Sequence, residues 1–212
     1  MSPASGGRKK KSAGSSFLEL IVIVVVALGL ALLVQAFVVK PYRIPSESMV
    51  PTLEVGQRVL VNRVTGRLGS PGVGDITVFN PPTGAERPPL DQCAVRPRRG
   101  AACDTPTSVR SDVNFIKRIV GAPGDTIAVK GGRVIRNGKL ADEPFISDTC
   151  ETGAGAACDL PVPIKVPPGH WFMMGDNRGQ SDDSRFWGPV PEGWIIGPAF
   201  ATYWPPDRIG IF

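Results

Sequence analysis

Residues 20–39 form an apolar run of twenty residues whose only polar side chain is that of Gln35. As a helix the run extends ~30 Å, at ~1.5 Å per residue, enough to cross the hydrocarbon core of a bilayer. A cleaved secretory signal has the same basic-then-apolar order, but a shorter apolar core of ~7–15 residues that ends in small residues. This run ends in bulky residues at 37–39. We therefore predict an uncleaved transmembrane anchor over residues 17–39, with a signal peptide as the alternative.

The segment before the anchor, residues 1–16, is small, polar and basic, which predicts a disordered cytoplasmic tail. The chain has 24 Lys and Arg against 19 Asp and Glu, and the run from Arg8 to Lys11 supplies most of that excess. The charge is therefore a local basic tag, which suits an anionic lipid surface better than a nucleic acid. Because basic flanks stay in the cytoplasm, the chain after residue 39 is expected outside.

Residues 40–212 are rich in turn-forming residues and in short apolar runs, with 25 Gly and 22 Pro in the whole chain. This pattern predicts a mostly β fold, with an antiparallel β-sheet domain after the helix. Asn137-Gly138 predicts a type I′ hairpin turn. Two long insertions, 81–112 and 147–163, interrupt the strands. The expected strands are 58–64, 76–79, 115–120, 126–129, 134–136, 139–140, 164–166, 171–174 and 200–203.

The four cysteines fall into two local pairs, one in each insertion: Cys93 with Cys103, and Cys150 with Cys158. Neither pair has CxxC spacing and no histidine lies near, which disfavours a zinc site. Two disulfides in an oxidising compartment fit better, and they agree with an extracytoplasmic domain. Four cysteines allow three connectivities, of which we favour the two local pairs.

A nucleophile is suggested by the stretch Pro45-Ser46-Glu47-Ser48-Met49-Val50-Pro51-Thr52-Leu53, in which prolines stiffen the backbone around two serines. A serine hydroxyl needs a base to remove its proton. In a strand over 114–120, Lys117 shares a face with apolar side chains, and burial there lowers a lysine pKa. Arg118 cannot serve, because a guanidinium stays charged. The alternative is that Lys117 buries only its stem and reaches water.

A polar loop is expected near the end of the chain, with the sequence Gly175-Asp176-Asn177-Arg178-Gly179-Gln180-Ser181-Asp182-Asp183-Ser184-Arg185-Phe186-Trp187-Gly188. It is either an ordinary solvated turn or a framework in which side chains form hydrogen bonds to the backbone.

Four sequence segments occur in a characteristic order: PSESMVPTL (45–53), GDITVF (74–79), FIKRIVGAPGD (115–125) and GDNRGQSDDSRFWGPV (175–190). Together with the basic tail and the apolar run, the chain resembles the single-span bacterial type I signal peptidases. The resemblance covers nearly everything except the two cysteine-bearing insertions.

The resemblance implies a Ser–Lys dyad, with Ser48 as nucleophile and Lys117 as general base. It also implies that the Ser46 hydroxyl joins the Ser48 N–H in an oxyanion hole and that Ser181 orients the lysine. Asp183 and Arg185 match a supporting ion pair. Glu47 stands where the family often has glycine, which leaves its effect on specificity open. Seven residues match family positions that line the pockets for small substrate residues at P1 and P3: Tyr42, Ile44, Pro45, Met49, Leu53, Phe115 and Ile116.

The expected function is that of a membrane-bound serine endopeptidase that removes signal peptides from exported preproteins. The resemblance implies no metal or other cofactor, and no role for His170. The expected partners are signal peptides and the lipid bilayer. Three tryptophans either contact the lipid headgroups or are core residues of the domain: Trp187, Trp194 and Trp204. A processing peptidase for a single secreted or conjugation substrate is the alternative. A non-catalytic descendant would have lost Ser48 or Lys117, and a sortase-like enzyme would need a reactive cysteine with a histidine.

Overall fold

The computed structural model describes residues 13–64, 69–86, 93–147, 150 and 158–212. The chain divides into two compact units, Met1–Val38 and Val39–Phe212. In the first unit, helix α1 spans Ala13–Phe37, and its side chains from 17 to 32 are exposed. Among the described residues, no helix meets the length and hydropathy needed to cross a membrane. Residues 1–12 of the predicted disordered tail lie outside the described residues, whereas the prediction is wrong for residues 13–16, because α1 already begins at Ala13.

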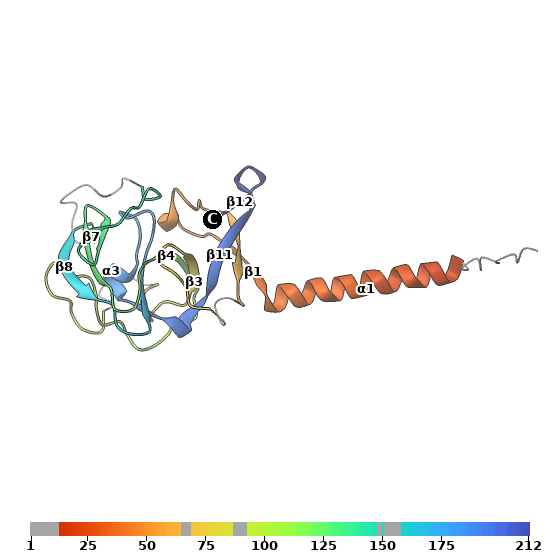
Figure 1. Ribbon diagram of the computed structural model, residues 1–212, viewed down its shortest axis with the longest axis horizontal. Coiled ribbons are helices and arrows are strands. Elements are labelled where there is room, and N and C mark those ends of the chain that lie inside the picture. Colours follow the sequence, from red (N-terminus) through yellow and green to blue (C-terminus); the bar gives the residue numbers. More distant parts are fainter. Residues whose placement is uncertain (1–12, 65–68, 87–92, 148–149, 151–157) are drawn as a thin grey trace, which may run out of the picture. The chain divides into compact units, whose positions relative to one another are not determined.

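The second unit contains an antiparallel eight-stranded sheet in the order β1-β2-β11-β3-β4-β9-β10, with β12 paired to β11 (Figure 1). The mostly β, antiparallel architecture predicted from the sequence is confirmed. The strands are β1 (Val39–Arg43), β2 (Arg58–Asn62), β3 (Ile76–Phe79), β4 (Phe115–Gly121), β9 (His170–Met174), β10 (Val190–Pro191), β11 (Ile195–Trp204) and β12 (Gly210–Ile211).

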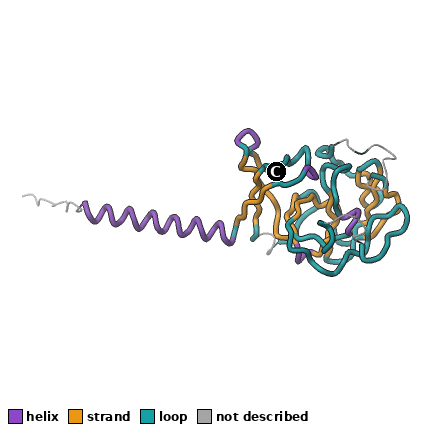
Figure 2. The backbone as a smooth tube through the Cα atoms, turned by 180° about the vertical axis from the view of Figure 1, so that it is seen from behind, coloured by secondary structure: helices purple, strands orange, loops and turns teal. Residues whose placement is uncertain are grey.

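A four-stranded antiparallel sheet, in the order β7-β6-β5-β8, forms the other part of this unit. Its strands are β5 (Thr126–Lys130), β6 (Arg133–Arg136), β7 (Lys139–Leu140) and β8 (Leu160–Lys165). Asn137 and Gly138 have φ of 53° and 76°, which confirms the predicted tight turn between β6 and β7. Much of the chain around the sheets is loop, as Figure 2 shows, with short helices α3 (Ser184–Trp187), η1 (Glu47–Met49), η2 (Glu192–Trp194) and η3 (Pro206–Arg208).

The sequence pattern missed β1, β10 and β12. Strand β1 contains Pro41, which lacks a backbone donor, and it is found at the edge of the sheet, where such a residue is tolerated. The helix ends at Phe37 and Val39 already pairs with Asn62 of β2, so the predicted segment 17–39 runs past the end of α1. Strand β11 is longer than predicted because it pairs with β2, β3 and β12 in turn.

Three apolar clusters contact β4, and the two nearest Lys117 lie on opposite faces of the strand. Ile116 packs against the first of these two clusters, whereas Phe115 packs against the second, which contains Ile119. Lys117 therefore lies on the face of the second cluster, as strand alternation predicts. The first cluster consists of Ile44, Met49, Leu53, Val59, Val61, Ile76, Val78 and Ala199. The second includes Phe79, Ala85, Ile119, Trp171, Met173, Trp187, Val190 and Ile195.

The two disulfides join Cys93 to Cys103 and Cys150 to Cys158, the pairing that the sequence analysis favoured. Cys103 is buried, and its N–H donates to the Arg185 carbonyl oxygen at 3.0 Å. The first insertion is therefore fastened to α3 and not loose in solvent. Residues 87–92 of this insertion, and 148–149 and 151–157 of the second, lie outside the described part of the chain.

Candidate active site

Ser48 and Lys117 meet side by side, although 69 positions separate them in sequence. Ser48 lies in η1, where Pro45 and Pro51 bracket the turn, and Lys117 comes from the middle of β4. Lys117 Nζ lies 2.6 Å from Ser48 Oγ. Lys117 is only 5% exposed and Ser48 only 7%. The alternative in which Lys117 extends to water is therefore wrong.

Burial lowers the pKa of Lys117 from its usual 10.5 to about 8. Loss of hydration disfavours the ammonium, and this effect exceeds the attraction of the Asp183 and Asp182 carboxylates. The neutral amine is thus accessible near physiological pH. The neutral amine is the form in which a lysine can accept a proton.

A buried ion pair, Asp183 with Arg185, lies next to the lysine. Both side chains are fully buried, and Arg185 Nε contacts Asp183 Oδ1 at 2.7 Å. Asp183 also caps α3 and accepts the Gly175 N–H at 3.0 Å. Burial by itself raises the pKa of Asp183, but the Arg185 guanidinium, the Gly175 N–H and Lys117 together more than offset this and keep the pKa below its ordinary value. The carboxylate therefore stays charged and braces the loop that passes behind the lysine.

A second carboxylate, Asp176, connects β4 to the serine stretch. Arg118 donates to it through Nε at 2.9 Å and Nη2 at 2.7 Å, which forms a bidentate pair. Thr52 Oγ1 donates to the same carboxylate at 2.5 Å. Arg118 lies on the opposite face of β4 from Lys117, so one strand supplies both the candidate base and this anchor.

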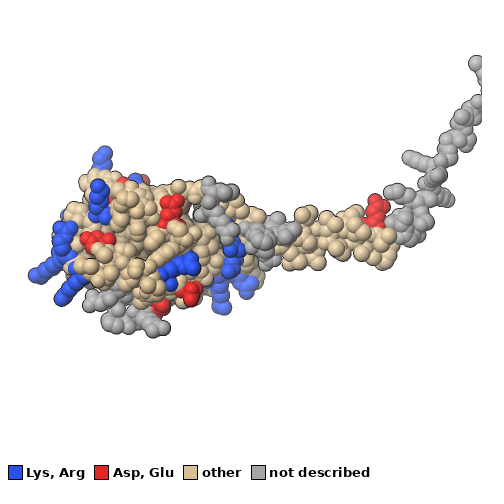
Figure 3. Space-filling model, turned by 90° about the horizontal axis from the view of Figure 1, so that it is seen from below, with Lys and Arg blue, Asp and Glu red and all other residues tan. Residues whose placement is uncertain are grey.

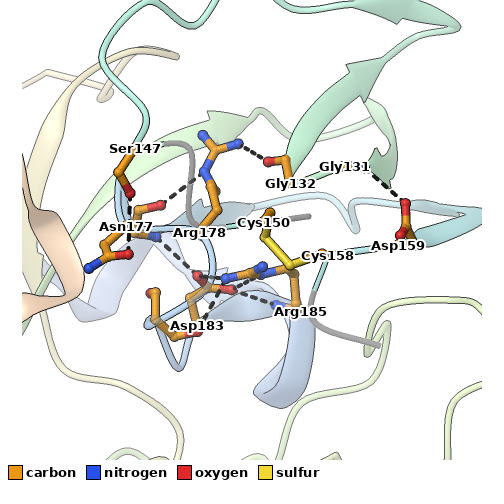
Figure 4. The surroundings of a disulfide bond; sticks show 12 residues. Gly131, Gly132, Ser147, Cys150, Cys158, Asp159, Asn177, Arg178, Asp183 and Arg185 are labelled. Atoms are coloured by element: carbon orange, nitrogen blue, oxygen red, sulfur yellow. Dashed lines mark hydrogen bonds and ion pairs between the residues drawn. A yellow bond between two sulfur atoms is a disulfide. The ribbon is translucent and has the colours of Figure 1, made fainter. Parts of the chain in front are cut away.

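Arg178 fixes the same loop from the other side. It is fully buried, and it pairs with Glu143 at 2.6 Å while its Nε donates to the Gly175 carbonyl oxygen at 2.9 Å. It also donates to the carbonyl oxygen of Gly132, next to the Cys150–Cys158 disulfide (Figure 4). An uncompensated charge here would be costly, so breaking this pair destabilises the loop. The solvated-turn alternative for residues 175–188 is wrong.

Two further serines border the dyad. Ser46 is exposed, and its Oγ lies 3.4 Å from Ser48 Oγ. Ser181 is buried, and its hydroxyl has no hydrogen-bond partner among the described residues. A Cβ on Gly175 would clash with both the Ser181 Oγ and the Ser48 carbonyl oxygen. Only glycine fits at position 175, because the loop passes so close to Ser48.

A groove of about 680 Å³ opens onto the dyad. Five of the seven residues predicted to bind substrate line it, whereas Met49 and Leu53 are fully buried beneath it in the first cluster. The groove is lined by Tyr42, Arg43, Ile44, Pro45, Ser46, Ser48, Val78, Ala85, Glu86, Val113, Asn114, Phe115, Ile116, Lys117, Gln180 and Asp182.

The first insertion contributes to this groove, which the sequence did not indicate. Ala85 packs in the second cluster, and the Glu86 carboxylate accepts a hydrogen bond from Ser111 at 3.3 Å. Glu47, which precedes Ser48 in the chain, is exposed and is not among the described residues that line the groove. No pattern in the sequence joins residues 85–86 to the serine stretch, because the contact is purely tertiary.

The remaining sequence candidates are not among the described residues that line the groove. His170 is partly exposed, and its Nδ1 lies 2.9 Å from the Pro168 carbonyl oxygen. Trp187 is fully buried in the second cluster, so the idea that it touches lipid is wrong. Trp194 is partly buried against the same cluster, and Trp204 is 50% exposed.

The arrangement has the parts that acyl transfer needs: a hydroxyl in contact with a buried amine, a charged brace behind it and an open groove in front. Comparison with known proteins agrees. The family model "Signal peptidase, peptidase S26" matches residues 17–204. A signal peptidase I from Leptolyngbya laminosa is 36% identical over 210 residues, covering 98% of this chain and 90% of that protein.

Other relatives extend this similarity. A probable signal peptidase I-1 from Synechocystis is 39% identical over 192 residues, covering 91% of this chain and 85% of that protein. A solved signal peptidase I from Enterococcus faecalis V583 is more distant, with 22% identity, a TM-score of 0.41, and coverage of 60% of this chain and 95% of that one. With a family model over most of its length and near full-length relatives, the chain belongs to the signal peptidase family, peptidase S26, and is a serine endopeptidase.

Proposed function

We propose that this protein removes N-terminal signal peptides from exported preproteins, with Ser48 as nucleophile and Lys117 as general base. The observation that carries the proposal is the 2.6 Å contact between Ser48 Oγ and the Nζ of a lysine that is 5% exposed. A hydroxyl and a desolvated amine in contact at the end of a groove are the reactive pair of a Ser–Lys hydrolase.

The reaction proceeds in two halves. The neutral Lys117 amine takes the proton from Ser48 Oγ as that oxygen attacks the scissile carbonyl carbon. The resulting ammonium then gives its proton to the leaving amine of the mature protein, and the signal peptide remains as an ester on Ser48. A water molecule, deprotonated by Lys117, hydrolyses this ester and restores the serine.

The developing oxyanion needs donors in addition to this pair. We assign that role to the Ser48 N–H and the Ser46 hydroxyl, since Ser46 Oγ lies 3.4 Å from the nucleophile. Loss of one such donor typically costs ~10²–10³ in rate. Ser181 presents a buried hydroxyl in the same loop as the Asp183–Arg185 pair, and we assign it the orientation of Lys117.

The groove favours small side chains at P1 and P3. Ile44, Met49 and Leu53 are at most 1% exposed, so the first cluster closes the floor beneath Ser48. Tyr42 and Ile116 are partly buried against the same cluster. Large side chains at P1 or P3 would have to displace a packed core, which costs more than they gain by burial.

We also propose that residues 17–39 anchor the protein in the cell membrane as a single span, with residues 1–16 in the cytoplasm and 40–212 outside. The apolar sequence and the exposed side chains of α1 support this, and Figure 3 shows the described part of the helix almost without charge. Trp204 is 50% exposed and Ile211 85% exposed at the β11–β12 pair, which suits contact with headgroups. On the face of the second unit that Figure 3 shows, Lys and Arg side chains are interspersed with Asp and Glu side chains.

Cleavage of a purified preprotein by the full-length protein in detergent tests the function. Ser48→Ala and Lys117→Ala should each abolish processing. The control substitutions Ser70→Ala and Lys165→Ala, which change an exposed serine and an exposed lysine, should leave processing intact. A Ser48→Ala protein that cleaves at more than a few per cent of the wild-type rate would refute the nucleophile. A panel of preproteins distinguishes broad signal-peptide processing from action on a single substrate.

A further inference from the structure

Asn177 makes two hydrogen bonds to the backbone of the nucleophile turn. Its N–H donates to the Ser48 carbonyl oxygen at 3.1 Å. Its side-chain Nδ2 donates to the Glu47 carbonyl oxygen, also at 3.1 Å. Asn177 is only 5% exposed, so its own side chain is largely shielded from water. Two successive carbonyl oxygens, one on each side of the Ser48 N–H, are thus held by one residue.

Because the Glu47–Ser48 peptide unit is rigid, the Asn177 contact with the Glu47 carbonyl also fixes the direction of the Ser48 N–H. A peptide bond is planar and trans, so its C=O and N–H point in opposite directions. Whatever fixes the Glu47 carbonyl therefore aims the Ser48 N–H. The Val50 N–H also donates to the Glu47 oxygen, at 3.0 Å, but this bond lies within the same short turn and moves with it. The Asn177 contact, in contrast, ties the peptide to a different loop of the domain.

We propose that Asn177 is a positioning residue that aims the Ser48 N–H at the oxyanion, and that the second cysteine-bearing insertion sets its side chain through Ser147. The inference rests on the proposed function and adds a residue to that machinery. It concerns the transition state, since the Ser48 N–H gains most when the carbonyl oxygen becomes negative.

Ser147 makes the contact that orients the Asn177 side chain. Its Oγ–H donates to Asn177 Oδ1 at 3.2 Å, as Figure 4 shows, and its N–H donates to the Asp176 carbonyl oxygen at 3.1 Å. An amide has one acceptor and one donor end, so a hydroxyl on Oδ1 turns Nδ2 toward Glu47. Ser147 is the first residue of the insertion that the Cys150–Cys158 disulfide closes.

The flanking residues limit what else Asn177 could be doing. Asp176 on one side is held by Arg118 and Thr52, and Arg178 on the other side is held by Glu143. The backbone of this loop is therefore fixed without the Asn177 amide. Removing the amide changes the Glu47 contact and the Ser147 contact, and it leaves these charged anchors in place.

The test compares steady-state cleavage by the full-length wild type, Asn177→Ala, Ser147→Ala and Ser147→Thr. We expect kcat to fall ~10–100-fold in Asn177→Ala, with KM changed less than about threefold, because the lost alignment acts in the transition state. Ser147→Ala should show a smaller fall in kcat, and Ser147→Thr, which keeps the hydroxyl, should restore it. Affinity for a peptide boronate, which forms a tetrahedral adduct on the serine, should fall in parallel with kcat.

Thr126→Val is the matched control, because the Thr126 hydroxyl also donates to an asparagine Oδ1, that of Asn137, at 3.4 Å, and neither residue lines the groove. Its kcat should stay within about twofold of wild type. The proposal is overturned if Asn177→Ala keeps wild-type kcat or loses activity through KM alone. If Asn177→Ala does not fold, the decision passes to the Ser147 pair, and equal kcat in Ser147→Ala and Ser147→Thr overturns it. Wild-type protein that cleaves no preprotein refutes the proposed function itself, and this inference with it.

Discussion

Replacement of Lys117 by methionine should abolish cleavage and yet stabilise the fold near neutral pH. Methionine has a similar length and no charge, so it fills the same space near Phe115 without an ammonium to desolvate. In the wild type, burial lowers the lysine pKa from 10.5 to about 8. At ~1.4 kcal/mol per pKa unit, holding the charged form inside the fold costs about 3 kcal/mol.

The sign of the pH dependence follows from proton binding in the two states. Below pH 8 the lysine is protonated in both the folded and the unfolded chain, so the full cost is present. Between the folded pKa of about 8 and the unfolded value of 10.5, the unfolded chain binds more protons, and raising the pH stabilises the fold. Above the unfolded value the amine is neutral in both states and the cost is gone. The Lys117→Met variant has no such dependence, because the methionine side chain does not titrate.

Methionine cannot make the 2.6 Å contact that Lys117 makes with Ser48 Oγ. The loss of this contact costs about 1 kcal/mol of stability, which offsets part of the gain. The expected net gain is therefore about 2 kcal/mol below pH 8, and it should vanish as the pH approaches ~10. Urea denaturation midpoints of the full-length proteins over that range measure it, with the exposed Lys165→Met as control. A Lys117→Met protein that is clearly less stable than wild type at neutral pH, or a difference that does not change with pH, refutes the reasoning.

The kcat/KM of the wild type should rise with pH through a midpoint of about 8, the lowered pKa of Lys117, and a flat profile across neutral and alkaline pH would exclude it as the base. Gly175→Ala should lose activity and ~1–3 kcal/mol of stability, because its Cβ meets the Ser48 carbonyl oxygen; wild-type kcat and midpoint in this variant would contradict that clash. Non-reducing peptide mapping should recover Cys93 linked to Cys103, and replacing both by serine should cost about 3 kcal/mol, with cleavage partly retained. A Cys93 peptide crosslinked to any other cysteine would contradict this pairing.

The strands that could be predicted are those whose local pattern agrees with their tertiary setting. Strand β3 begins and ends where its apolar run does, and the β6–β7 turn follows from Asn137-Gly138, because positive φ is required at both positions. Strand β1 was missed because Pro41 and Lys40 weaken the local pattern, while pairing with β2 supplies the order. A short edge strand depends on its neighbour more than on its own residues.

The sequence by itself, through its four family motifs, predicted the pairing of Ser48 with Lys117, two residues that are in contact in the structure. Strand alternation placed Lys117 among apolar neighbours, and it separated that lysine from Arg118, which lies on the other face and binds Asp176. Local cysteine spacing also indicated the two disulfides, since each pair is close enough in the chain to meet inside one loop.

Only the tertiary structure decided how far the lysine is desolvated, which loop holds the nucleophile and what forms the groove. The 5% exposure of Lys117, the Asn177 contacts to Glu47 and Ser48, and the Glu86 wall all join segments far apart in the chain. Such contacts leave no local periodicity. Their energies depend on distance and burial, which exist only once the strands have packed together.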